Sequence, residues 1–551
     1  MSHQTFARKR GSRLLVLIVA LVVAGCSSHW PAFRHDGLRT GGQLRGGPLS
    51  HPAAVQNLAI GWTFPASAGV PINPPLIAFR ASPVIYKKIV YIGNGNGFFY
   101  AINAIDGTLR WQYPKTGPPL DQTFHDGNPS SNGIASSATI ARINGVDAVI
   151  FGAPDMSIGT GLGSGRLFAL NAQTGDEIWK SPEIAALRSD GMTHEQIGYS
   201  SPLVFNNHVY VGVGDHGDDP IQRGKVAAVF LSNGQIDNGF GVSGSFFTTG
   251  PPRGGGVWGS VAGWDGVYVT TGNSNIGGPE PTPDNALSML RLDPNSGSII
   301  WDWKPVPYDL DGDPDWSATP SVMLSSCGTL ALSTEKDGWT WALNTGNGTP
   351  GSPSIRWAFP PGPWSTGGFH SGDGTVHGDT RYLRPGAVWD DVYIVQTGGL
   401  TVTQDVHEGF QHLYALNACA PDAQRVRWIK DVPNSSHNCV YGWPPPQVTS
   451  GCQYSLGPPT VDRGIVYVGT DLGHLVAIGD PTVVPPDGMR CTYPLLPNII
   501  CQIFHLPMVP DPHVIRDVNL NAGPINTEPA LLRNGRVYVS TDGGQVVMLK
   551  P

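Results

Sequence analysis

The sequence contains little charge, because only 14% of its 551 residues are Asp, Glu, Lys or Arg. It also lacks a basic excess: 34 Lys and Arg stand against 42 Asp and Glu, which gives a formal net charge of −8. Proteins that bind the phosphate backbone of nucleic acids need clustered positive charge. This balance therefore excludes a nucleic-acid partner.

The sequence also lacks a run of about 20 apolar residues, the length that a transmembrane helix needs. Its N-terminal apolar run, residues 14–24, is shorter than that and follows four basic residues between positions 8 and 13. A basic segment before a short apolar run is the pattern of an export signal. We therefore expect residues 1–25 to be a signal peptide.

The signal ends in Val23-Ala24-Gly25-Cys26-Ser27, which resembles the lipobox of bacterial lipoproteins. The resemblance implies cleavage before Cys26 and attachment of diacylglycerol to its sulfur. The mature chain, with a net charge of −12 after four basic residues are lost, would be tethered to a membrane by acyl chains. Its expected location is the cell envelope, at the outer membrane, on the periplasmic or the surface face.

Cysteine is scarce, and none of the seven lies in a Cys-x-x-Cys pair or a Cys-x-x-Cys-His haem motif. With Cys26 lipidated, six remain in an oxidising compartment, which favours three disulfides. Six cysteines allow fifteen connectivities. The plausible local pairs are Cys439 with Cys452 and Cys491 with Cys501, and this leaves Cys327 and Cys419 as the third candidate pair.

A strand pattern, clearest at residues 90–103, recurs eight times at a spacing near sixty residues. The residues equivalent in the repeats are Tyr91, Phe151, Tyr210, Tyr268, Leu332, Tyr393, Tyr467 and Tyr538. Short alternating strands with glycine-rich turns, repeated at this period, predict a β-propeller, because a single four-stranded blade cannot bury both of its faces. We therefore expect an all-β protein with eight four-stranded antiparallel blades.

The tail of the repeat, an alanine followed by Asn or Asp, Gly and Trp, is clearest at residues 101–111 and has lost its Trp in the third copy. Trp62 looks like the tail of a repeat whose start is missing, and the last repeat has no tail. The N-terminal strand should therefore complete the last blade. The predicted organisation is a tether over 26–57 and one propeller over 58–551, with long loops that build a functional face.

The alanine, Asn/Asp, Gly and Trp tail resembles that of the PQQ-repeat, or quinoprotein alcohol dehydrogenase-like, propellers, in which each Trp docks between neighbouring blades. Polyvinyl-alcohol dehydrogenase-like quinoproteins resemble the chain best in their motifs. The superfamily also contains a cofactor-free tetrathionate hydrolase and an outer-membrane assembly lipoprotein that acts as a scaffold. Fold therefore does not settle function.

The segment Gly254-Gly255-Gly256-Val257-Trp258-Gly259, with Thr271-Gly272-Asn273 after it, resembles two dehydrogenase signatures. The resemblance implies that Trp258 stacks on the quinone PQQ, beside Gly256, and that Asn273 gives an oxygen to calcium. The alternative is that Trp258 packs in the core and Asn273 is a turn residue.

Asp315, in Asp315-Trp316-Ser317-Ala318-Thr319-Pro320, resembles the general base of these enzymes and is also a candidate calcium ligand. Lys336, followed by Asp337 and Gly338, resembles the lysine that stabilises charge on the quinone oxygen. We expect both to be catalytic residues, with Lys336 also binding the cofactor.

Two departures from the dehydrogenase pattern stand out. No two cysteines are adjacent, so the disulfide that covers PQQ in many relatives is absent. The register puts Thr160 where those enzymes have a calcium-binding Glu, and Asp155 is the carboxylate that could replace it.

The leading hypothesis is an envelope lipoprotein that oxidises an alcohol or polyol, small or polymeric, with PQQ and calcium, and passes electrons to a separate acceptor. One alternative is a non-catalytic propeller that binds other envelope proteins. Another is a cofactor-free hydrolase that uses Asp315.

Overall fold

The structure is a computed structural model. The residues that it describes are 29–43, 45–66, 72, 75–120, 133–155, 164–186, 195–215, 223–249, 254–273, 285–305, 316, 318–335, 339–346, 353–359, 384–397, 407–408, 412–435, 440–441, 456–491, 498–503 and 508–551. Within these ranges, no helix is both long enough and apolar enough to cross a membrane.

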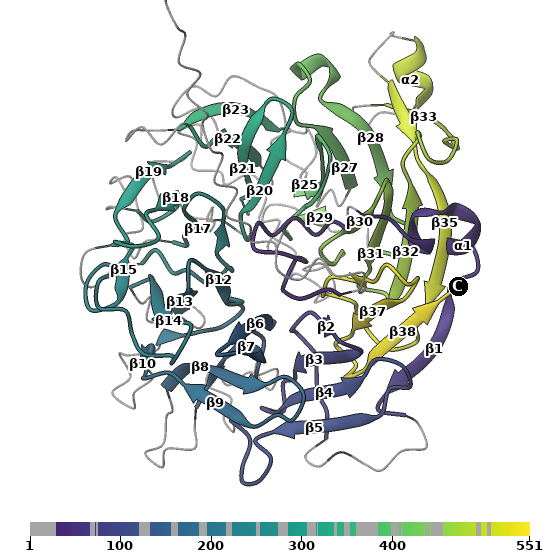
Figure 1. Cartoon of the computed structure of the whole chain (residues 1–551). Coiled ribbons are helices and arrows are strands. Elements are labelled where there is room, and N and C mark those ends of the chain that lie inside the picture. Colours follow the sequence, from purple (N-terminus) through teal and green to yellow (C-terminus); the bar gives the residue numbers. More distant parts are fainter. Residues whose placement is uncertain are drawn as a thin grey trace, which may run out of the picture.

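Eight antiparallel sheets stand around a centre (Figure 1). The four main strands of each run outwards in chain order, except that the outermost strand of blade 8 comes from the N-terminal part of the chain. The strands of blades 1 to 4 are β2 (Val84–Tyr86), β3 (Ile89–Gly93), β4 (Phe99–Asn103) and β5 (Leu109–Tyr113); β6 (Thr139–Ile143), β7 (Val146–Pro154), β8 (Ser164–Asn171) and β9 (Glu177–Lys180), with the short β10 (Ala185–Ala186) on β8; β12 (Leu203–Phe205), β13 (His208–Asp215), β14 (Lys225–Phe230) and β15 (Ser245–Phe247), with β11 (Glu195–Gln196) on β13; and β16 (Ala262–Gly263), β17 (Val267–Thr270), β18 (Met289–Leu292) and β19 (Ile299–Trp303).

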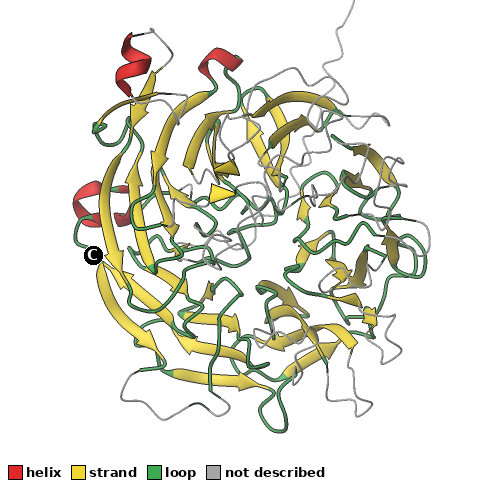
Figure 2. Cartoon of the chain, turned by 180° about the vertical axis from the view of Figure 1, so that it is seen from behind, coloured by secondary structure: helices red, strands yellow, loops and turns green. Residues whose placement is uncertain are grey.

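The strands of blades 5 to 8 are β20 (Ser321–Ser325), β21 (Gly328–Thr334), β22 (Thr340–Asn344) and β23 (Ser354–Phe359); β24 (Ala387–Trp389), β25 (Val392–Thr397), β27 (His412–Asn417) and β28 (Val426–Asp431); β30 (Thr460–Asp462), β31 (Ile465–Gly469), β32 (His474–Gly479) and β35 (His513–Asn519); and β36 (Ala530–Leu531), β37 (Val537–Ser540), β38 (Val546–Lys550) and β1 (Ala59–Phe64). The predicted eight-bladed propeller is thus confirmed. Seen from behind, the ring consists of strands joined by loops, with only a few helical turns at its rim (Figure 2).

Smaller elements decorate the ring. They are the two-stranded sheets β26 (His407–Glu408) with β29 (Val440–Tyr441) and β33 (Gly488–Cys491) with β34 (Met508–Asp511), the helices α1 (Pro52–Val55) and α2 (Asn498–Ile503), and the 3-10 turns η1 (Pro48–Ser50) and η2 (Asp422–Gln424).

The N-terminal strand closes the ring, as predicted. β1 pairs with β38 over the register Ala59↔Lys550 to Phe64↔Val546 and so becomes the outer strand of blade 8. This pairing joins the two ends of the chain in one sheet and removes an open strand edge.

The repeated Trp of one blade docks on the repeated Gly of the next. The Nε1 of Trp179, in blade 2, donates to the carbonyl of Leu231 in blade 3 at 3.0 Å, and its ring lies over Gly234. In blade 3, which lacks the Trp, the buried Phe240 lies over Gly297 of blade 4 instead. An aromatic ring therefore seals this contact between blades even where the motif is lost.

Replacing Gly175 by Ala should destabilise the protein by about 2 to 4 kcal/mol. The residue has φ +74°, and a Cβ there would lie 2.6 Å from Trp111 Cδ2. Gly145→Ala is the matched control, because its φ is +85° with nothing within 4 Å of the added Cβ. Urea unfolding of both variants should show the larger loss for Gly175→Ala. Equal losses would mean that the Trp contact contributes little.

The predicted tether is wrong for residues 29–43, which instead line the inside of the ring. The backbone of this segment pairs with Ile85 of blade 1 and Thr139 of blade 2, and then bonds to blades 4, 5, 6 and 7. Arg34 and Arg39 are fully buried in it. Polar residues suggested a solvated tether, but here they are satisfied by the backbone carbonyls of the blades.

A ring of hydroxyl groups connects blades 8 and 1 to 5, just before their innermost strands. The backbone N–H of each position donates to the hydroxyl of the next blade, as from Ser82 to Ser137 Oγ at 2.8 Å. The bonds run from Glu528 through Ser82, Ser137, Ser201 and Ser260 to Thr319.

The remaining arc of this ring has no hydroxyl, since blades 6, 7 and 8 carry Pro385, Pro458 and Glu528 two residues before their innermost strands, the position that a hydroxyl occupies in blades 1 to 5. The guanidinium of Arg34 fills it. It donates to the carbonyls of Gly386 at 2.5 Å and Pro459 at 2.7 Å, and to Glu528 Oε2 at 3.1 Å. The N-terminal segment thus completes the inner ring with one side chain.

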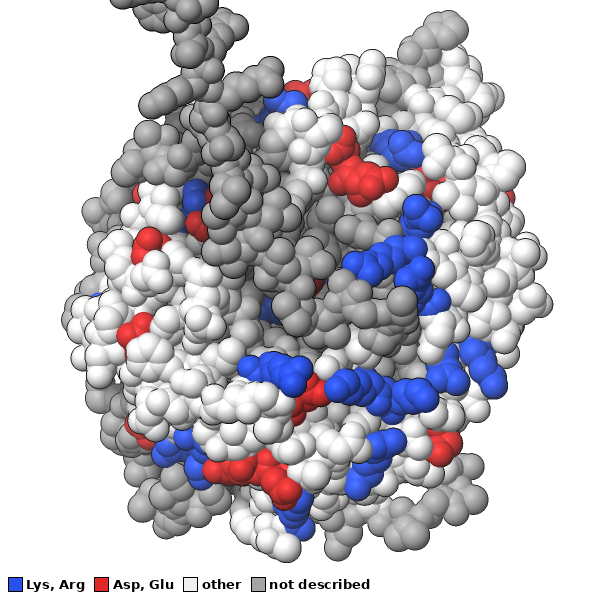
Figure 3. All heavy atoms as spheres, viewed as in Figure 1, with Lys and Arg blue, Asp and Glu red and all other residues white. Residues whose placement is uncertain are grey.

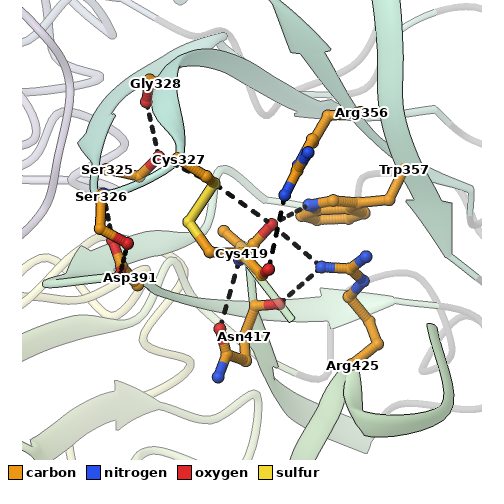
Figure 4. The surroundings of a disulfide bond; sticks show 11 residues. Ser325, Ser326, Cys327, Gly328, Arg356, Trp357, Asp391, Asn417, Cys419 and Arg425 are labelled. Atoms are coloured by element: carbon orange, nitrogen blue, oxygen red, sulfur yellow. Dashed lines mark hydrogen bonds between the residues drawn. A yellow bond between two sulfur atoms is a disulfide. The ribbon is translucent and has the colours of Figure 1, made fainter. Parts of the chain in front are cut away.

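A disulfide links blades 5 and 6. It joins Cys327, in the turn between β20 and β21, to Cys419, which follows β27, and so confirms the third candidate pair (Figure 4). Beside it, Trp357 Nε1 and Arg425 Nη1 both donate to the carbonyl of Ala418. The side chains of the other four candidate cysteines, and Cys26, lie outside the described residues.

Candidate functional site

The glycine run and Asn273 lie at one end of blade 4. Residues 254–259 precede β16 and Asn273 follows β17, and the two strands are antiparallel neighbours with Ala262 opposite Tyr268. The start of one strand and the end of the other therefore fall at the same end of the ring. We call this end the site face, and the opposite end, which carries the turn between the first two strands of each blade, the turn face.

Close backbone packing explains the glycines. Gly255 N donates to the carbonyl of Asn273 at 2.6 Å, and Gly272 N donates to the carbonyl of Gly256 at 2.8 Å. A Cβ on Gly224, in the neighbouring blade 3, would lie 1.8 Å from the carbonyl oxygen of Gly255. Only glycine allows this approach. The run is thus a backbone shelf held between blades 3 and 4.

Trp258 stands on this shelf and is only partly buried. The tryptophans that dock between blades are different: Trp301 is 2% exposed and Trp428 is fully buried. The alternative of simple core packing therefore describes those residues better than Trp258. A partly exposed indole on a fixed backbone is the kind of side chain on which a planar ligand can stack.

Asn273 is held on the same shelf by the backbone bond from Gly255, and it too is partly exposed. Its amide oxygen is of the type that a hard cation such as calcium prefers. The structure therefore places three of the predicted site residues, Gly256, Trp258 and Asn273, together.

Asp315 and Lys336 lie outside the described residues, but each is next to one that is described. Their neighbours Trp316 and Glu335 form an antiparallel bridge in blade 5. Both are almost fully buried, and Glu335 Oε2 accepts a hydrogen bond of 2.7 Å from Trp341 Nε1. The two chain segments that carry the predicted catalytic residues are thus fixed against each other.

The sequence interpretation missed a cluster of tryptophans beside this bridge. Trp303 packs against Trp341 with ring centroids 4.6 Å apart and against Trp316 at 6.1 Å, and Trp339 lies 5.9 Å from Trp341. Trp303 and Trp339 are partly exposed. The sequence feature that indicates this cluster is the high density of Trp between residues 301 and 341. The repeat pattern explains only one of these tryptophans, Trp301.

Asp155 does not fit the role of a calcium ligand. Its fully buried carboxylate has Oδ2 3.3 Å from Arg166 Nε and 3.2 Å from Lys180 Nζ. Two cations already neutralise it, and a calcium ion there would meet positive charge. Thr160, the other position considered, lies outside the described residues. In the described ranges, no group of three or more His, Cys, Asp or Glu side chains could hold a metal ion.

Solved structures of similar fold include the quinohemoprotein alcohol dehydrogenase from Comamonas testosteroni, with a TM-score of 0.61, 17% identity, and coverage of 95% of this chain and 80% of that one. A europium-containing methanol dehydrogenase matches with a TM-score of 0.59 and 15% identity, over 95% of this chain and 98% of that one. At these identities the likeness shows the fold.

Among curated proteins, the chain is similar to the dehydrogenase subunit of the quinone-type alcohol dehydrogenase from Gluconacetobacter polyoxogenes, with 24% identity over 272 residues. The corresponding subunit from Komagataeibacter europaeus is 23% identical over 273 residues. Each match covers 42% of this chain, and the chain spans one third of the length of these relatives.

A family model described as the glucose/ethanol/alcohol dehydrogenase β-propeller domain matches residues 50–363, more than half of the sequence and all of the site blades 3 to 5. The chain therefore belongs to the PQQ β-propeller family of the glucose, ethanol and alcohol dehydrogenases.

Proposed function

We propose that this protein is a quinoprotein dehydrogenase that oxidises an alcohol or polyol with PQQ as its cofactor. The observation that carries the proposal is the placement of Trp258, partly exposed on the glycine shelf to which Asn273 is also bonded. Family membership supports the same reaction class. The substrate is small or polymeric, and the partly exposed Trp303 of blade 4 and Trp339 of blade 5 provide an apolar wall beside which its carbon chain would lie.

PQQ, when bound, supplies the acceptor for the hydride that leaves the carbinol carbon. Trp258 would support the planar cofactor from one side, against the backbone of Gly256. Asp315 would accept the proton of the substrate hydroxyl, and Lys336 would place a fixed positive charge next to the cofactor. The bridge between Trp316 and Glu335 keeps the segments of these two residues in register.

Calcium is proposed to be bound by Asn273 and Asp315 without Asp155, because Asp155 is paired with Arg166 and Lys180. A site with one carboxylate balances less of the ion's charge than a site with two. We therefore propose weaker calcium binding than a site with a second-blade Glu would give.

The sequence has no Cys-x-x-Cys-His motif, so the electrons would pass to a separate acceptor. Cys26 would hold the protein at the cell envelope by its lipid, where envelope proteins could bind it.

The test is calorimetric titration of PQQ into a soluble variant that begins at residue 27. We expect binding at micromolar concentration or tighter with calcium, and binding at least 100-fold weaker after Trp258→Ala. Trp264→Ala is the matched control: it removes an indole that is 44% exposed on the turn face of the same blade, and it should bind like the parent. A repeat of the titration with a calcium chelator measures the contribution of the ion.

If the parent does not bind PQQ, the proposal fails. The alternatives would then be tested by turnover of tetrathionate without quinone and by capture of envelope proteins. A variant with both Asp315 and Lys336 replaced would separate these two, since only the hydrolase should lose its function.

A further inference from the structure

Exposed basic side chains gather on the turn face of blades 7, 8, 1 and 2. We call them the basic arc, and its members are Arg45, Lys87, Lys88, Arg142, Arg463 and Arg533. Figure 3 shows Lys and Arg side chains following the rim of the central region over these blades. The formal net charge of the whole chain is −8, so a cluster of positive side chains differs from the chain's average charge.

Contacts between the N-terminal segment and two turns join the parts of the arc on blades 7 and 8. A Cβ on Gly46 would lie 2.6 Å from Arg463 Cδ, and a Cβ on Gly47 would lie 2.4 Å from the carbonyl oxygen of Arg533. The backbone beside Arg45 thus runs between the two turns. The arc spans four adjacent blades.

Among the described residues, one solvent-accessible carboxylate lies within the arc, whereas Asp462, beside Arg463, is fully buried. Asp147 faces Arg142 across the β6–β7 pair and lies 2.5 Å from Lys87 Nζ. It offsets one positive charge and leaves the others. The equivalent turns of blades 4 and 6 carry Asp265, Asp390 and Asp391 instead, so the basic residues of these turns lie on one half of the turn face.

The described chain begins at the edge of this arc. Trp30 pairs with Ile85, and the ring of His29 lies 4.5 Å from that of Tyr86, which precedes Lys87. Cys26 is three residues before His29, and three extended residues span about 10 Å at most. A lipid on Cys26 would therefore enter a membrane close to the basic arc.

We propose that the basic arc binds a surface of anionic phospholipid headgroups. This binding would orient the propeller so that its turn face lies against the membrane. The glycine shelf and Trp258 lie at the opposite end of the blades and would face away from the lipid, open to substrate. The inference rests on Cys26 as the anchor for its orientation, and it does not depend on PQQ binding. Charge complementarity identifies the occupant as an anionic bilayer surface rather than an apolar partner.

Each Lys or Arg close to an anionic membrane surface strengthens binding by roughly fivefold, and salt screens the attraction. The acyl chains would supply the anchoring itself, so the arc would fix the orientation.

The test uses the variant that begins at residue 27, which has no lipid, and measures its co-sedimentation with vesicles. We expect binding to vesicles of 30% phosphatidylglycerol in phosphatidylcholine, little binding to phosphatidylcholine alone, and loss of binding in 0.5 M NaCl. Lys88→Glu/Arg463→Glu/Arg533→Glu should weaken binding to the anionic vesicles at least 100-fold.

The matched control is Arg110→Glu/Lys115→Glu/Arg356→Glu, which reverses the same number of exposed charges outside the arc. It should bind almost like the parent. Equal binding by the two triple variants, equal binding to both vesicle types, or no binding to anionic vesicles would overturn the inference, and the last result would point to an acidic protein partner. PQQ titration of the arc variant keeps the two proposals separate, since its cofactor affinity should match the parent's.

Discussion

Replacing Arg34 by Met is expected to lower the free energy of unfolding by about 3 to 5 kcal/mol, one of the two largest single-residue effects that we predict. Both Arg34 and Glu528 have no exposed side-chain surface, and their charged groups lie 3.1 Å apart. Burial lowers the pKa of Arg34 and raises the pKa of Glu528, and the contact between them opposes both shifts. Without the guanidinium, Glu528 would keep a buried carboxylate with no cation beside it.

The measurement is urea unfolding followed by tryptophan fluorescence, with two companion variants. Arg34→Met/Glu528→Gln removes both charges and should cost clearly less than the sum of the single changes. Arg34→Lys keeps a charge for Glu528 but loses the forked geometry that reaches Gly386 and Pro459, and it should be intermediate. If the free energy of unfolding of Arg34→Met lies within 1 kcal/mol of that of the parent, the guanidinium does not stabilise the inner ring.

The propeller was predictable from sequence because its information is local and repeated. The anchors of the repeat, such as Tyr91 and Tyr268, are at most 1% exposed on the second strand of their blades, where the pattern placed them. Closure by the strand of Trp62 followed from the incomplete first and last repeats. The pair Cys327–Cys419 followed only as the remainder after two local pairs.

The inner segment could not be predicted in this way. Residues 29–43 are rich in Arg, His and Gly, and they are buried because the carbonyls of distant blades satisfy them. Arg34, for example, contacts residues more than 350 positions away. The sequence does show that blades 6 to 8 lack the hydroxyl of the inner ring, but it does not show which side chain replaces it.

The same distinction applies to the candidate site, where some placements could be predicted from the sequence and others could not. The adjacency of Gly256, Trp258 and Asn273 follows from their places before the first and after the second strand of a repeat. The ion pairing of Asp155 could not be predicted in this way. It depends on the strand register that puts Arg166 opposite Ala153, and on the length of the Lys180 side chain that reaches it. Asp315 and Lys336 stay predictions whose neighbours, Trp316 and Glu335, are paired.

Asp462 is expected to make the protein less stable as the pH rises from about 4 to 7. It ends β30, has no exposed surface, and neither carboxyl oxygen has a hydrogen-bond partner among the described residues. Burial raises its pKa to about 7, although Arg463 opposes the shift. The nearby Tyr467 phenol donates to the carbonyl of Leu49 and gives the carboxyl no hydrogen bond.

The direction of the effect follows from the two pKa values. Below about pH 4 the carboxyl is protonated in the folded and the unfolded state, so it contributes nothing. Between about pH 4 and 7 the unfolded chain releases the proton and the folded chain keeps it, which favours unfolding. Above pH 7 both forms are ionised and the penalty is constant, at roughly 4 kcal/mol for a shift of this size.

Asp462→Asn removes the charge and keeps the shape, so it should stabilise the protein at pH 8 by a few kcal/mol more than at pH 5. Urea unfolding of parent and variant at the two pH values measures this difference. Asp390→Asn is the matched control, since Asp390 is an exposed aspartate directly after the first strand of blade 6 and should show no such change. An effect of Asp462→Asn on stability that is the same at both pH values would show that the pKa of the carboxyl is not raised in the folded protein.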